Sequence, residues 1–586
     1  MYIEKINSPE DVKKLSVEQM TVMASEIRKF LLDKLSAHGG HIGPNLGMVE
    51  ATIALHYVFD SPRDKMVFDV SHQSYIHKML TGRKDAFLIP ADYDDVSGYT
   101  NPKESKHDFF EIGHTSTSVS LACGLAKARD LRGGNENVIA VIGDGSLSGG
   151  EAYEGLSNAG EAGTNMIVVV NDNEMSIAEN HGGLYANLRQ LRATEGKSEC
   201  NFFKSLNLDY LYVKDGNDIA ALIEAFQKVK DAARPVVVHI HTLKGKGYAP
   251  AEHNKERYHW GMPFNLATGE PKVDYSGVPD YGNLTGEYLL AKMKEDPMVV
   301  AITSGTPSVM GFNPARREEA GKQLVDVGIA EEHAVALASG IAKNGGRPVY
   351  GVYSTFIQRT YDQLSQDLCL NNNPAVIAVF AASVYGMSDA THLGYFDIPM
   401  MSNIPNLVYL APTCKEEYFA MLEWAIAQRE HPVAVRVPGG AVVERHENFD
   451  ADYGRLNTYK MVRKGSKVAV LALGSFFGLG ESVVGKLKSG LGVEATLINP
   501  RYITGIDQEM LEGLKADHDL VVTLEDGQLD GGFGEKISRY YGSSEMKVLN
   551  YGLRKEFADR FNVSDLLREN RLTEEQIAED VAKLIK

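Results

Sequence analysis

The sequence has few cysteines, and they are widely separated. Four occur in 586 residues, at Cys123, Cys200, Cys369 and Cys414, without any C-x-x-C spacing. A disulfide framework and a zinc site both need clustered or regularly spaced cysteines, so this distribution argues against either. We expect reduced, buried thiols of the kind found in cytosolic proteins.

Long apolar runs and an excess of basic residues are also absent. No run approaches the roughly 20 apolar residues of a membrane span, and residues 1–5 lack the basic-then-apolar pattern of a signal peptide. Lys and Arg number 60 against 78 Asp and Glu, which gives a net charge of -18. Nucleic acid and anionic membranes are bound by clustered basic residues, so we expect neither as a partner. The sequence predicts a cytoplasmic protein.

What the chain does contain is an ordinary globular composition, 44% hydrophobic and 24% charged, over a length that suits about three domains. Apolar strands alternate with helix-length segments, which predicts an α/β fold with three doubly wound, mostly parallel sheets. The expected domains are 1–264, 286–450 and 458–586, with a turn-rich linker at 265–285. The expected strands lie at 138–142, 166–170, 235–240, 298–302, 348–352, 374–379, 432–437, 467–473, 493–498 and 520–524.

Two polar turns directly follow neighbouring apolar strands of the first domain. One holds Asp144 between two glycines, and the other is the segment from Asn171 to Asn173. Ligands of open α/β sheets bind just beyond the carboxyl ends of such strands. Asp144 and the amide of Asn173 are hard oxygen donors, and with a diphosphate they would complete the octahedron that Mg²⁺ prefers. Two ordinary strand-to-helix turns are the alternative, but the paired spacing favours a thiamine diphosphate site.

Gly145 and Ser146 open an expected helix, so their backbone N–H groups are expected to face a phosphate. In the second domain, Glu331 precedes an apolar helical pattern over residues 334–341. A lone glutamate at a helix start is often a surface residue that complements the helix dipole. Phe356 follows a strand, and an aromatic residue there is usually packed in the core. A functional role for Glu331 or Phe356 therefore depends on the rest of the sequence.

Several longer segments together resemble one family, the 1-deoxy-D-xylulose-5-phosphate synthases, over almost the whole chain. The matching segments are 38–47, 72–83, 113–118, 171–177, 244–252 and 353–363, together with Glu331. The resemblance implies two thiamine diphosphate-binding folds followed by a transketolase C-terminal-like domain, a homodimer, and bound thiamine diphosphate and Mg²⁺. It also implies a reaction that decarboxylates pyruvate and joins the two-carbon unit to an aldehyde acceptor, glyceraldehyde 3-phosphate.

The resemblance also implies a role for individual residues. Mg²⁺ would be held by Asp144, Asn173 and the carbonyl of Met175, and Glu331 would activate the aminopyrimidine on which Phe356 stacks. Burial raises a glutamate pKa, which suits proton exchange near neutral pH. The other expected cofactor-binding residues are His72, Gly113, His114, Thr115, Ser116, Gly145 and Ser146. The expected catalytic residues, beside Glu331, are His41, His72, His259, His392, Tyr353 and Arg359.

Three departures from the family concern the acceptor. Two arginines that the family uses on the acceptor phosphate are replaced by Ala381 and Gly439. A guanidinium suits a phosphate dianion, at roughly 1.5–3 kcal/mol per hydrogen bond to a charged group. The acid before His392 is lost or moved to Asp389, and the stretch 180–209 is short compared with the family. We expect a changed acceptor, unless Arg359, Arg436 or a nearby lysine compensates.

Other functions fit the same motifs less well. A transketolase and the decarboxylating component of a 2-oxoacid dehydrogenase share the glycine-flanked Asp144 motif, but segments 244–252 and 353–363 favour the synthase branch. A non-catalytic thiamine diphosphate binder needs neither Glu331 nor the histidines. A dinucleotide-binding Rossmann domain is disfavoured because no G-x-G-x-x-G follows these strands.

Overall fold

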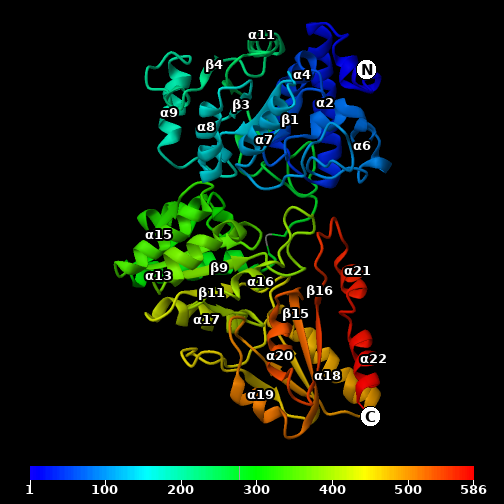
Figure 1. The fold of residues 1–586 in the computed structure, drawn as a ribbon, viewed down its shortest axis with the longest axis vertical. Coiled ribbons are helices and arrows are strands. Elements are labelled where there is room, and N and C mark those ends of the chain that lie inside the picture. Colours follow the sequence, from blue (N-terminus) through cyan, green and yellow to red (C-terminus); the bar gives the residue numbers. More distant parts are fainter. Residues whose placement is uncertain (276, 586) are drawn as a thin grey trace. The chain divides into compact units, whose positions relative to one another are not determined.

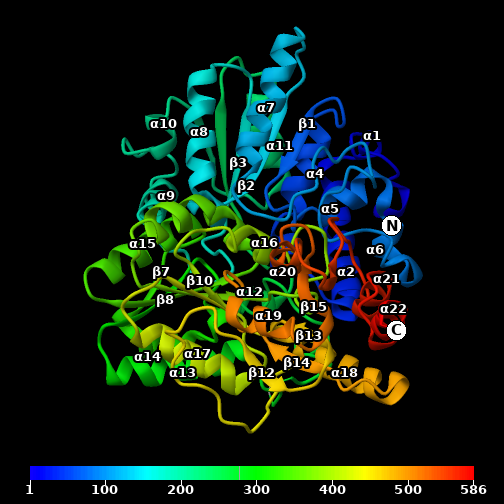
Figure 2. The same ribbon diagram turned by 60° about the horizontal axis from the view of Figure 1, so that its bottom comes forward.

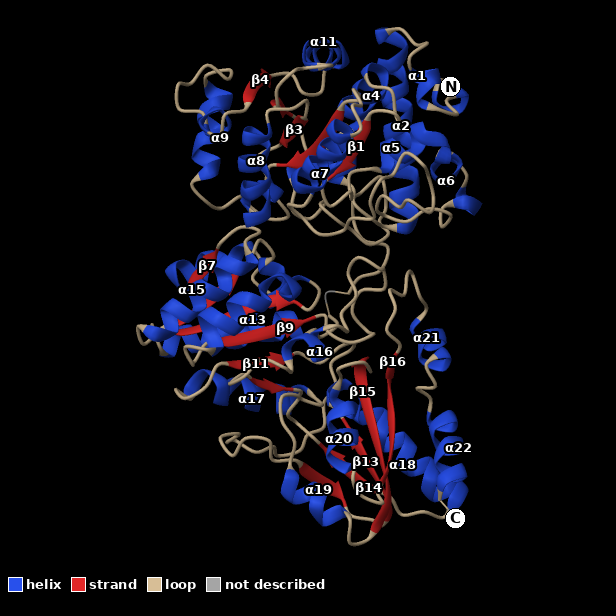
Figure 3. Cartoon of the chain, in the orientation of Figure 1, coloured by secondary structure: helices blue, strands red, loops and turns tan. Residues whose placement is uncertain are grey.

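The computed structural model describes residues 1–275 and 277–585. The chain divides into two compact units. Unit 1 contains Met1–Gly277 and Gly328–Ala330, and unit 2 contains Val278–Val327 and Glu331–Lys586. Unit 1 contains one sheet and unit 2 contains two, and helices pack against each of them (Figures 1 and 3).

Unit 1 is built on a five-stranded parallel sheet in the order β1-β2-β3-β5-β4. Its central strands β2, β3 and β5 were expected from their apolar runs, whereas the short β1 and the half-exposed β4 were not. The strand bounds are β1 Lys65–Phe68, β2 Val138–Gly143, β3 Ile167–Asp172, β4 Asp209–Val213 and β5 Val236–His241. All neighbouring strands run parallel, which brings their carboxyl ends to one edge.

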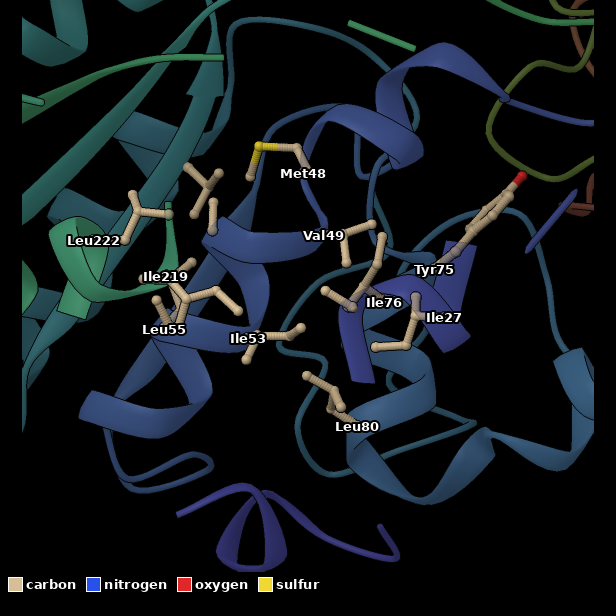
Figure 4. Packing of buried hydrophobic residues seen from close by; sticks show 14 of the residues in the cluster. Ile27, Met48, Val49, Ile53, Leu55, Tyr75, Ile76, Leu80, Ile219 and Leu222 are labelled. Carbon is tan, nitrogen blue, oxygen red and sulfur yellow. The ribbon is translucent and has the colours of Figure 1, made fainter. Parts of the chain in front are cut away.

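Both faces of this sheet are buried, because alternate residues of one strand pack into different clusters. Ile139 and Val141 of β2 join one cluster, while Val138, Ala140 and Ile142 join the other. Figure 4 shows part of the first cluster, where α4 and α11 bring their apolar side chains together. The second cluster lies under α7 and α8, which run alongside β2 and β3 (Figure 2).

The helices of unit 1 vary from single turns to six turns. The long helix α2 begins after Ser16, whose side chain and that of Gln19 form a reciprocal capping box. The helix bounds are α1 Pro9–Val12, α2 Val17–His38, α3 Gly43–Gly47, α4 Val49–Val58, α5 Tyr75–Lys78, α6 Asp85–Leu88, α7 Ser118–Leu131, α8 Gly150–Ala162, α9 Leu184–Ala193, α10 Phe202–Ser205, α11 Ile219–Val229 and α12 Ala249–His253.

Unit 2 contains two sheets. The first is parallel, in the order β10-β11-β9-β8-β6-β7, and the second is β12-β14-β13-β15-β16, in which only β12 runs antiparallel to its neighbour. The strand bounds are β6 Val299–Thr303, β7 Leu324–Asp326, β8 Arg347–Tyr353, β9 Val376–Phe380, β10 Val408–Leu410, β11 Val433–Arg436, β12 Lys460–Arg463, β13 Lys467–Ala472, β14 Thr496–Asn499, β15 His518–Gln528 and β16 Lys547–Leu553. The expected fold class, three mostly parallel α/β sheets, is confirmed.

The two sheets of unit 2 share one hydrophobic cluster. Ile377 and Val379 of β9 pack in the same cluster as Ala469 and Leu471 of β13. This common core explains why two sheets form one compact unit. The first helix, α13, begins at Tyr281, inside the segment expected as a linker. The helix bounds are α13 Tyr281–Glu295, α14 Pro314–Ala320, α15 Glu331–Lys343, α16 Asp397–Met401, α17 Lys415–Ala427, α18 Phe477–Leu491, α19 Gln508–Leu514, α20 Phe533–Tyr541, α21 Val563–Glu569 and α22 Glu574–Leu584.

The cysteines differ in part from the expectation. All four are free thiols, but only Cys369 and Cys414 are buried, while Cys123 is half-buried and Cys200 is exposed. Cys200 lies in the loop before α10. Across residues 1–275 and 277–585, the structure contains no helix with the length and hydropathy of a membrane span.

Candidate active site

The two polar turns of unit 1 lie at the same edge of the sheet. Gly143 of β2 is in register with Asn171 of β3, and the backbone N–H of Asp144 donates to the Asn171 carbonyl at 3.0 Å. Asp144 therefore leaves β2 beside the point where Asn173 leaves β3. Met175, the third expected metal ligand, lies two residues farther along the same turn and is half-buried.

Asp144 is enclosed by the short segment that follows the second turn. Asn180 Nδ2 donates to Asp144 Oδ2 at 2.8 Å, and the Tyr185 hydroxyl of α9 donates to the Asp144 carbonyl at 3.0 Å. Burial, together with the negative charge of Asp172, raises the pKa of Asp144 to about 7. A carboxylate with so few donors around it is well suited to a cation.

Asp172 and Asn173 have different surroundings, although they are adjacent. Asp172 accepts from Arg192 at 2.5 Å and lies 2.9 Å from His239 Nε2, so its charge is already compensated. The side-chain oxygen of Asn173 is buried and has no hydrogen-bond partner among the described residues. The side-chain oxygen of Asn180 is also buried without a hydrogen-bond partner among the described residues. A buried oxygen without a donor is costly unless a ligand satisfies it, which marks Asn173 rather than Asp172 as a metal ligand.

The turn at residues 113–118 is held by an aspartate that the sequence alone did not single out. Asp69 follows β1, and its two carboxylate oxygens accept the backbone N–H groups of Ser116 at 2.8 Å and Ser118 at 2.9 Å. Ser116 adopts a left-handed conformation (φ 75°), and its hydroxyl donates to the Ser146 carbonyl at 2.8 Å. These bonds join two of the expected diphosphate-binding segments. The apolar run 66–68 before Asp69 was the signal that could have indicated this residue.

The helix expected to open at Gly145 and Ser146 begins later. Residues Gly145–Ser148 form a short 3₁₀ turn, and α8 begins at Gly150. A Cβ on Gly145 would lie 2.6 Å from Ser176 Oγ, so only glycine allows this close approach of the two turns. The first two backbone N–H groups of this turn, those of Gly145 and Ser146, can still face a phosphate. This is the role that the sequence predicted for them at the start of a helix.

Three of the four expected catalytic histidines lie together in unit 1. The ring centroids of His41 and His72 are 4.9 Å apart, those of His72 and His259 are 5.2 Å apart, and those of His41 and His259 are 5.7 Å apart. Burial and the nearby Lys244 hold the pKa of His259 well below its ordinary value, so this ring is neutral. The fourth, His392, belongs to unit 2.

Lys244 is a buried cation beside these histidines that the sequence analysis placed only within a matching segment. Its Nζ donates to the Ser176 carbonyl at 2.5 Å and lies 3.1 Å from His259 Nδ1. Burial lowers the pKa of Lys244 to about 7, against the opposing charge of Asp144. Lys244 thus links the histidine cluster to the turn that contains Met175 and Ser176.

In unit 2, Glu331 is the first residue of α15 and is almost completely buried. Burial raises its pKa above the ordinary value, although Arg359 Nη1, 3.6 Å from Oε2, opposes the shift. No hydrogen-bond partner for Oε2 occurs among the residues that the structure describes. Glu331 is thus a buried carboxyl group whose protonated form is favoured by burial and can donate a hydrogen bond to a ligand.

The remaining expected residues of unit 2 form a second group near Glu331. Tyr353 ends β8, and its ring meets that of Phe356 edge-on at 5.7 Å. Phe356 in turn meets the His392 ring at 5.7 Å. Asp389 Oδ1 lies 3.1 Å from His392 Nδ1, so the acid displaced by one position still reaches the histidine.

The expected residues therefore form two groups, one in each unit. Unit 1 contains His41, His72, His259, Gly113, His114, Thr115, Ser116, Asp144, Gly145, Ser146, Asn173 and Met175. Unit 2 brings together Glu331, Tyr353, Phe356, Arg359 and His392. Arg436, considered above as a possible substitute for the lost arginines, is engaged by two buried carboxylates.

Comparisons with known proteins agree with this division. Residues 3–201 and 194–242 match the family model described as 1-deoxy-D-xylulose-5-phosphate synthase. Residues 278–443 match the transketolase pyrimidine binding domain, and residues 457–577 match the transketolase C-terminal domain. Between them, the three models cover both units.

Similar proteins extend over the whole chain. The 1-deoxy-D-xylulose-5-phosphate synthase of Clostridium beijerinckii is 39% identical, with 99% of this chain and 99% of that protein covered. Those of Shouchella clausii (100% of this chain and 99% of that protein) and Carboxydothermus hydrogenoformans (98% of each) are both 38% identical. The resemblance found in the sequence motifs is thus confirmed, and the chain belongs to the 1-deoxy-D-xylulose-5-phosphate synthase family of transketolase-type transferases.

Proposed function

We propose that this chain is a thiamine diphosphate- and Mg²⁺-dependent transferase. It decarboxylates pyruvate, or a related donor, and joins the two-carbon unit to an aldehyde. The observation that carries the proposal is the buried oxygen of Asn173, which has no hydrogen-bond partner among the described residues, at the strand end beside Asp144. A diphosphate-bound cation satisfies both groups at once.

The chemistry of the donors fits the cofactor. Asp144 and Asn173 supply one carboxylate and one amide oxygen, and the Met175 carbonyl supplies a third oxygen, which is the hard set that Mg²⁺ takes. Gly145 and Ser146 open the 3₁₀ turn, whose first backbone N–H groups can face the diphosphate, while Ser116 holds this turn through the bond from its hydroxyl to the Ser146 carbonyl. Thiamine diphosphate, when bound, supplies the reactive carbon and the electron sink that permit a 2-oxo acid to lose CO₂.

Glu331 is the proton carrier of unit 2. Its raised pKa lets the carboxyl group donate a hydrogen bond to a ring nitrogen of the aminopyrimidine and exchange that proton. Phe356 supplies the flat apolar face on which such a ring stacks. Arg359, at 3.6 Å, keeps Glu331 from being permanently protonated.

The histidines of unit 1 hold the substrate's polar groups. His259 is neutral because burial and Lys244 disfavour its charged form, so it can both donate and accept a hydrogen bond. The ring centroids of His41 and His72 lie 5.7 and 5.2 Å from that of His259, and these rings can hydrogen-bond a carboxylate or a developing alkoxide. The homodimer that the resemblance implies and the cytoplasmic location that the sequence predicts both stay predictions.

Pyruvate-dependent CO₂ release tests the proposal. The purified chain with thiamine diphosphate, Mg²⁺ and pyruvate should release CO₂, and adding an aldehyde should yield a product extended by two carbons. Calorimetry should show that thiamine diphosphate binds only with Mg²⁺ present. Cofactor binding without CO₂ release from pyruvate or another donor, at high enzyme concentration, would identify a non-catalytic binder and refute the proposal.

A further inference from the structure

The loop at residues 381–394 is the part of unit 2 that carries His392. It leaves the end of β9, and its neighbour is Gly439, which follows the adjacent strand β11. Ala381 is half-buried, while Tyr385 and Gly440 are exposed, so this edge of unit 2 is open to a ligand. We call residues 381–394 and 439–440 the acceptor rim, because His392 lies among them.

The cation nearest this rim in the sequence, Arg436, is fully occupied. Its Nε donates to Asp397 Oδ2 at 2.7 Å and its Nη1 donates to Asp526 Oδ1 at 2.5 Å. The side chain is buried, and Asp397 also receives the Tyr409 hydroxyl. Two carboxylates therefore surround one guanidinium, which leaves no net positive charge for a phosphate dianion.

Gly439 has no room for a side chain. A Cβ there would lie 2.7 Å from the Ala382 carbonyl oxygen and 2.8 Å from Ser383 Cβ. The Gly439 N–H donates to Ser475 Oγ at 2.9 Å, which fixes the backbone in this position. The local packing therefore excludes an arginine at position 439, because the Ala382 backbone and the Ser383 side chain occupy the space that its Cβ would need.

Two carboxylates lie along the rim, and one of them is paired with an arginine. Hydrogen bonds from His392 and Thr391 outweigh burial and hold the pKa of Asp389 below its ordinary value, so this group is ionised. Asp559 Oδ1 accepts the backbone N–H of Ala390 at 3.1 Å, and Arg560 Nε is paired with Asp559 Oδ2 at 3.1 Å. A phosphate ester placed here would meet carboxylates.

Two buried oxygens near the rim have no hydrogen-bond partner among the described residues, namely Ser383 Oγ and Asp526 Oδ2. Asp526 is close enough to contribute, after burial, to the raised pKa of the Tyr385 hydroxyl. Carboxylate, phenol and serine oxygens are the groups that exchange hydrogen bonds with neutral hydroxyls. The rim is thus suited to a polyol chain.

We propose that the acceptor of this enzyme is an unphosphorylated hydroxyaldehyde. The proposal rests on the proposed function, since it names the second substrate of the same reaction. Arg436 is neutralised, position 439 excludes a side chain, and Asp389 would repel a dianion. The hydroxyls of a neutral aldehyde meet none of these costs.

A matched pair of acceptors tests the proposal. With pyruvate as donor, we expect kcat/KM for D-glyceraldehyde to exceed that for D-glyceraldehyde 3-phosphate by about tenfold or more, the effect of one hydrogen bond to a charged group. Inorganic phosphate at millimolar concentration should not inhibit. A phosphate ester that reacts as well as or better than the neutral aldehyde would overturn the inference while leaving the proposed function intact. Absence of CO₂ release with any donor would instead overturn the proposed function.

A variant provides a second readout that does not depend on turnover. Ala381 already has a Cβ in its left-handed conformation (φ 49°), so Ala381→Arg adds a guanidinium without adding that strain. We expect it to bind glyceraldehyde 3-phosphate about tenfold more tightly in calorimetry than the natural chain does. Ala381→Gln, of similar reach but uncharged, should not. Tight binding of the phosphate ester by the natural chain and by Ala381→Gln would contradict the inference.

Discussion

Asp389 Oδ1 lies 3.1 Å from Nδ1 of His392, and the hydroxyl of Thr391 donates to the same carboxylate oxygen at 2.5 Å. The carboxylate thus fixes the His392 ring with a proton on Nδ1, so that Nε2 is left as the ring's acceptor. Although the acid stands one residue closer to the histidine than in the family pattern, it still reaches the ring.

We therefore expect Asp389→Asn to lower kcat by about 10- to 100-fold, the value of a hydrogen bond to a charged group. KM for the donor should change little, because Asp389 acts through His392. The pH profile of kcat should change, since the variant lacks the ionised carboxylate beside the His392 ring. Ser388→Ala, at the exposed neighbouring position, is the control and should retain the natural profile. An unchanged profile in Asp389→Asn would show that the pair is merely structural.

Metal binding should release protons near neutral pH. The pKa of Asp144 is raised to about 7 by burial and by Asp172, and a metal ligand must be deprotonated. Mg²⁺-dependent binding of thiamine diphosphate should therefore weaken as the pH falls below 7. Calorimetry in two buffers of different ionisation enthalpy measures the protons released. We expect Asp144→Asn to lose about 100-fold or more in Mg²⁺-dependent affinity.

The control for Asp144→Asn is Asp215→Asn, which makes the same charge change after β4, the edge strand of the same sheet, where the side chain is exposed. This variant should bind cofactor and metal as the natural chain does. Equal losses in both variants would mean that Asp144 acts through general charge rather than as a ligand.

The sequence predicted ten strands from their apolar runs and missed six others, namely β1, β4, β7, β10, β12 and β16. Runs such as 138–142 are buried on both faces, and this burial leaves a continuous apolar signal. β1, β7 and β10 have only three or four residues, too few for a pattern. Because β1 was missed, so was Asp69, which holds the turn at Ser116.

The candidate residues were predictable as a set, but their individual states were not. Nothing local distinguishes Asp172 from Asn173. The difference comes from Arg192 on α9 and His239 on β5, which engage Asp172 from distant parts of the chain. The same holds for Arg436. One of its carboxylate partners, Asp397, lies 39 residues before it in the sequence, and the other, Asp526, lies 90 residues after it. Tertiary contacts decide which polar groups remain available to a ligand.

Glu331→Gln should separate catalysis from stability. Activity should fall by about 100-fold or more, because glutamine cannot exchange a proton, while thiamine diphosphate affinity should change only slightly. Burial raises the folded-state pKa of Glu331, so the natural chain loses stability as pH rises above about 4.5, the unfolded value. Glu331→Gln has no carboxyl group to ionise at this position, so its free energy of unfolding should exceed that of the natural chain at pH 8. The difference between the two free energies should shrink toward pH 4.5.

Urea unfolding at the two pH values measures the stability difference, and single-turnover CO₂ release measures the activity. The adjacent Glu332→Gln, at a half-buried position, is the matched control and should retain most activity. A Glu331→Gln variant that retained full activity would remove Glu331 from the proposed mechanism.

Arg436 should be a residue of stability rather than of substrate binding. Its guanidinium compensates Asp397 and Asp526, all three being buried, so Arg436→Met leaves two carboxylates without a counter-charge. Breaking a buried pair in this way costs about 3–5 kcal/mol. The two tryptophans lie in different units, Trp260 in unit 1 and Trp424 in unit 2. In a Trp260→Phe background, Trp424 fluorescence therefore follows the urea unfolding of unit 2 alone.

The loss of stability in Arg436→Met depends on the burial of the three charged groups. Arg455→Met is the matched control, because Arg455 and its partner Glu509 are 79% and 84% exposed. An exposed pair contributes at most about 1 kcal/mol. If Arg436→Met were as stable as this control but bound a phosphorylated acceptor less tightly, Arg436 would be a phosphate ligand, and the acceptor inference would be wrong.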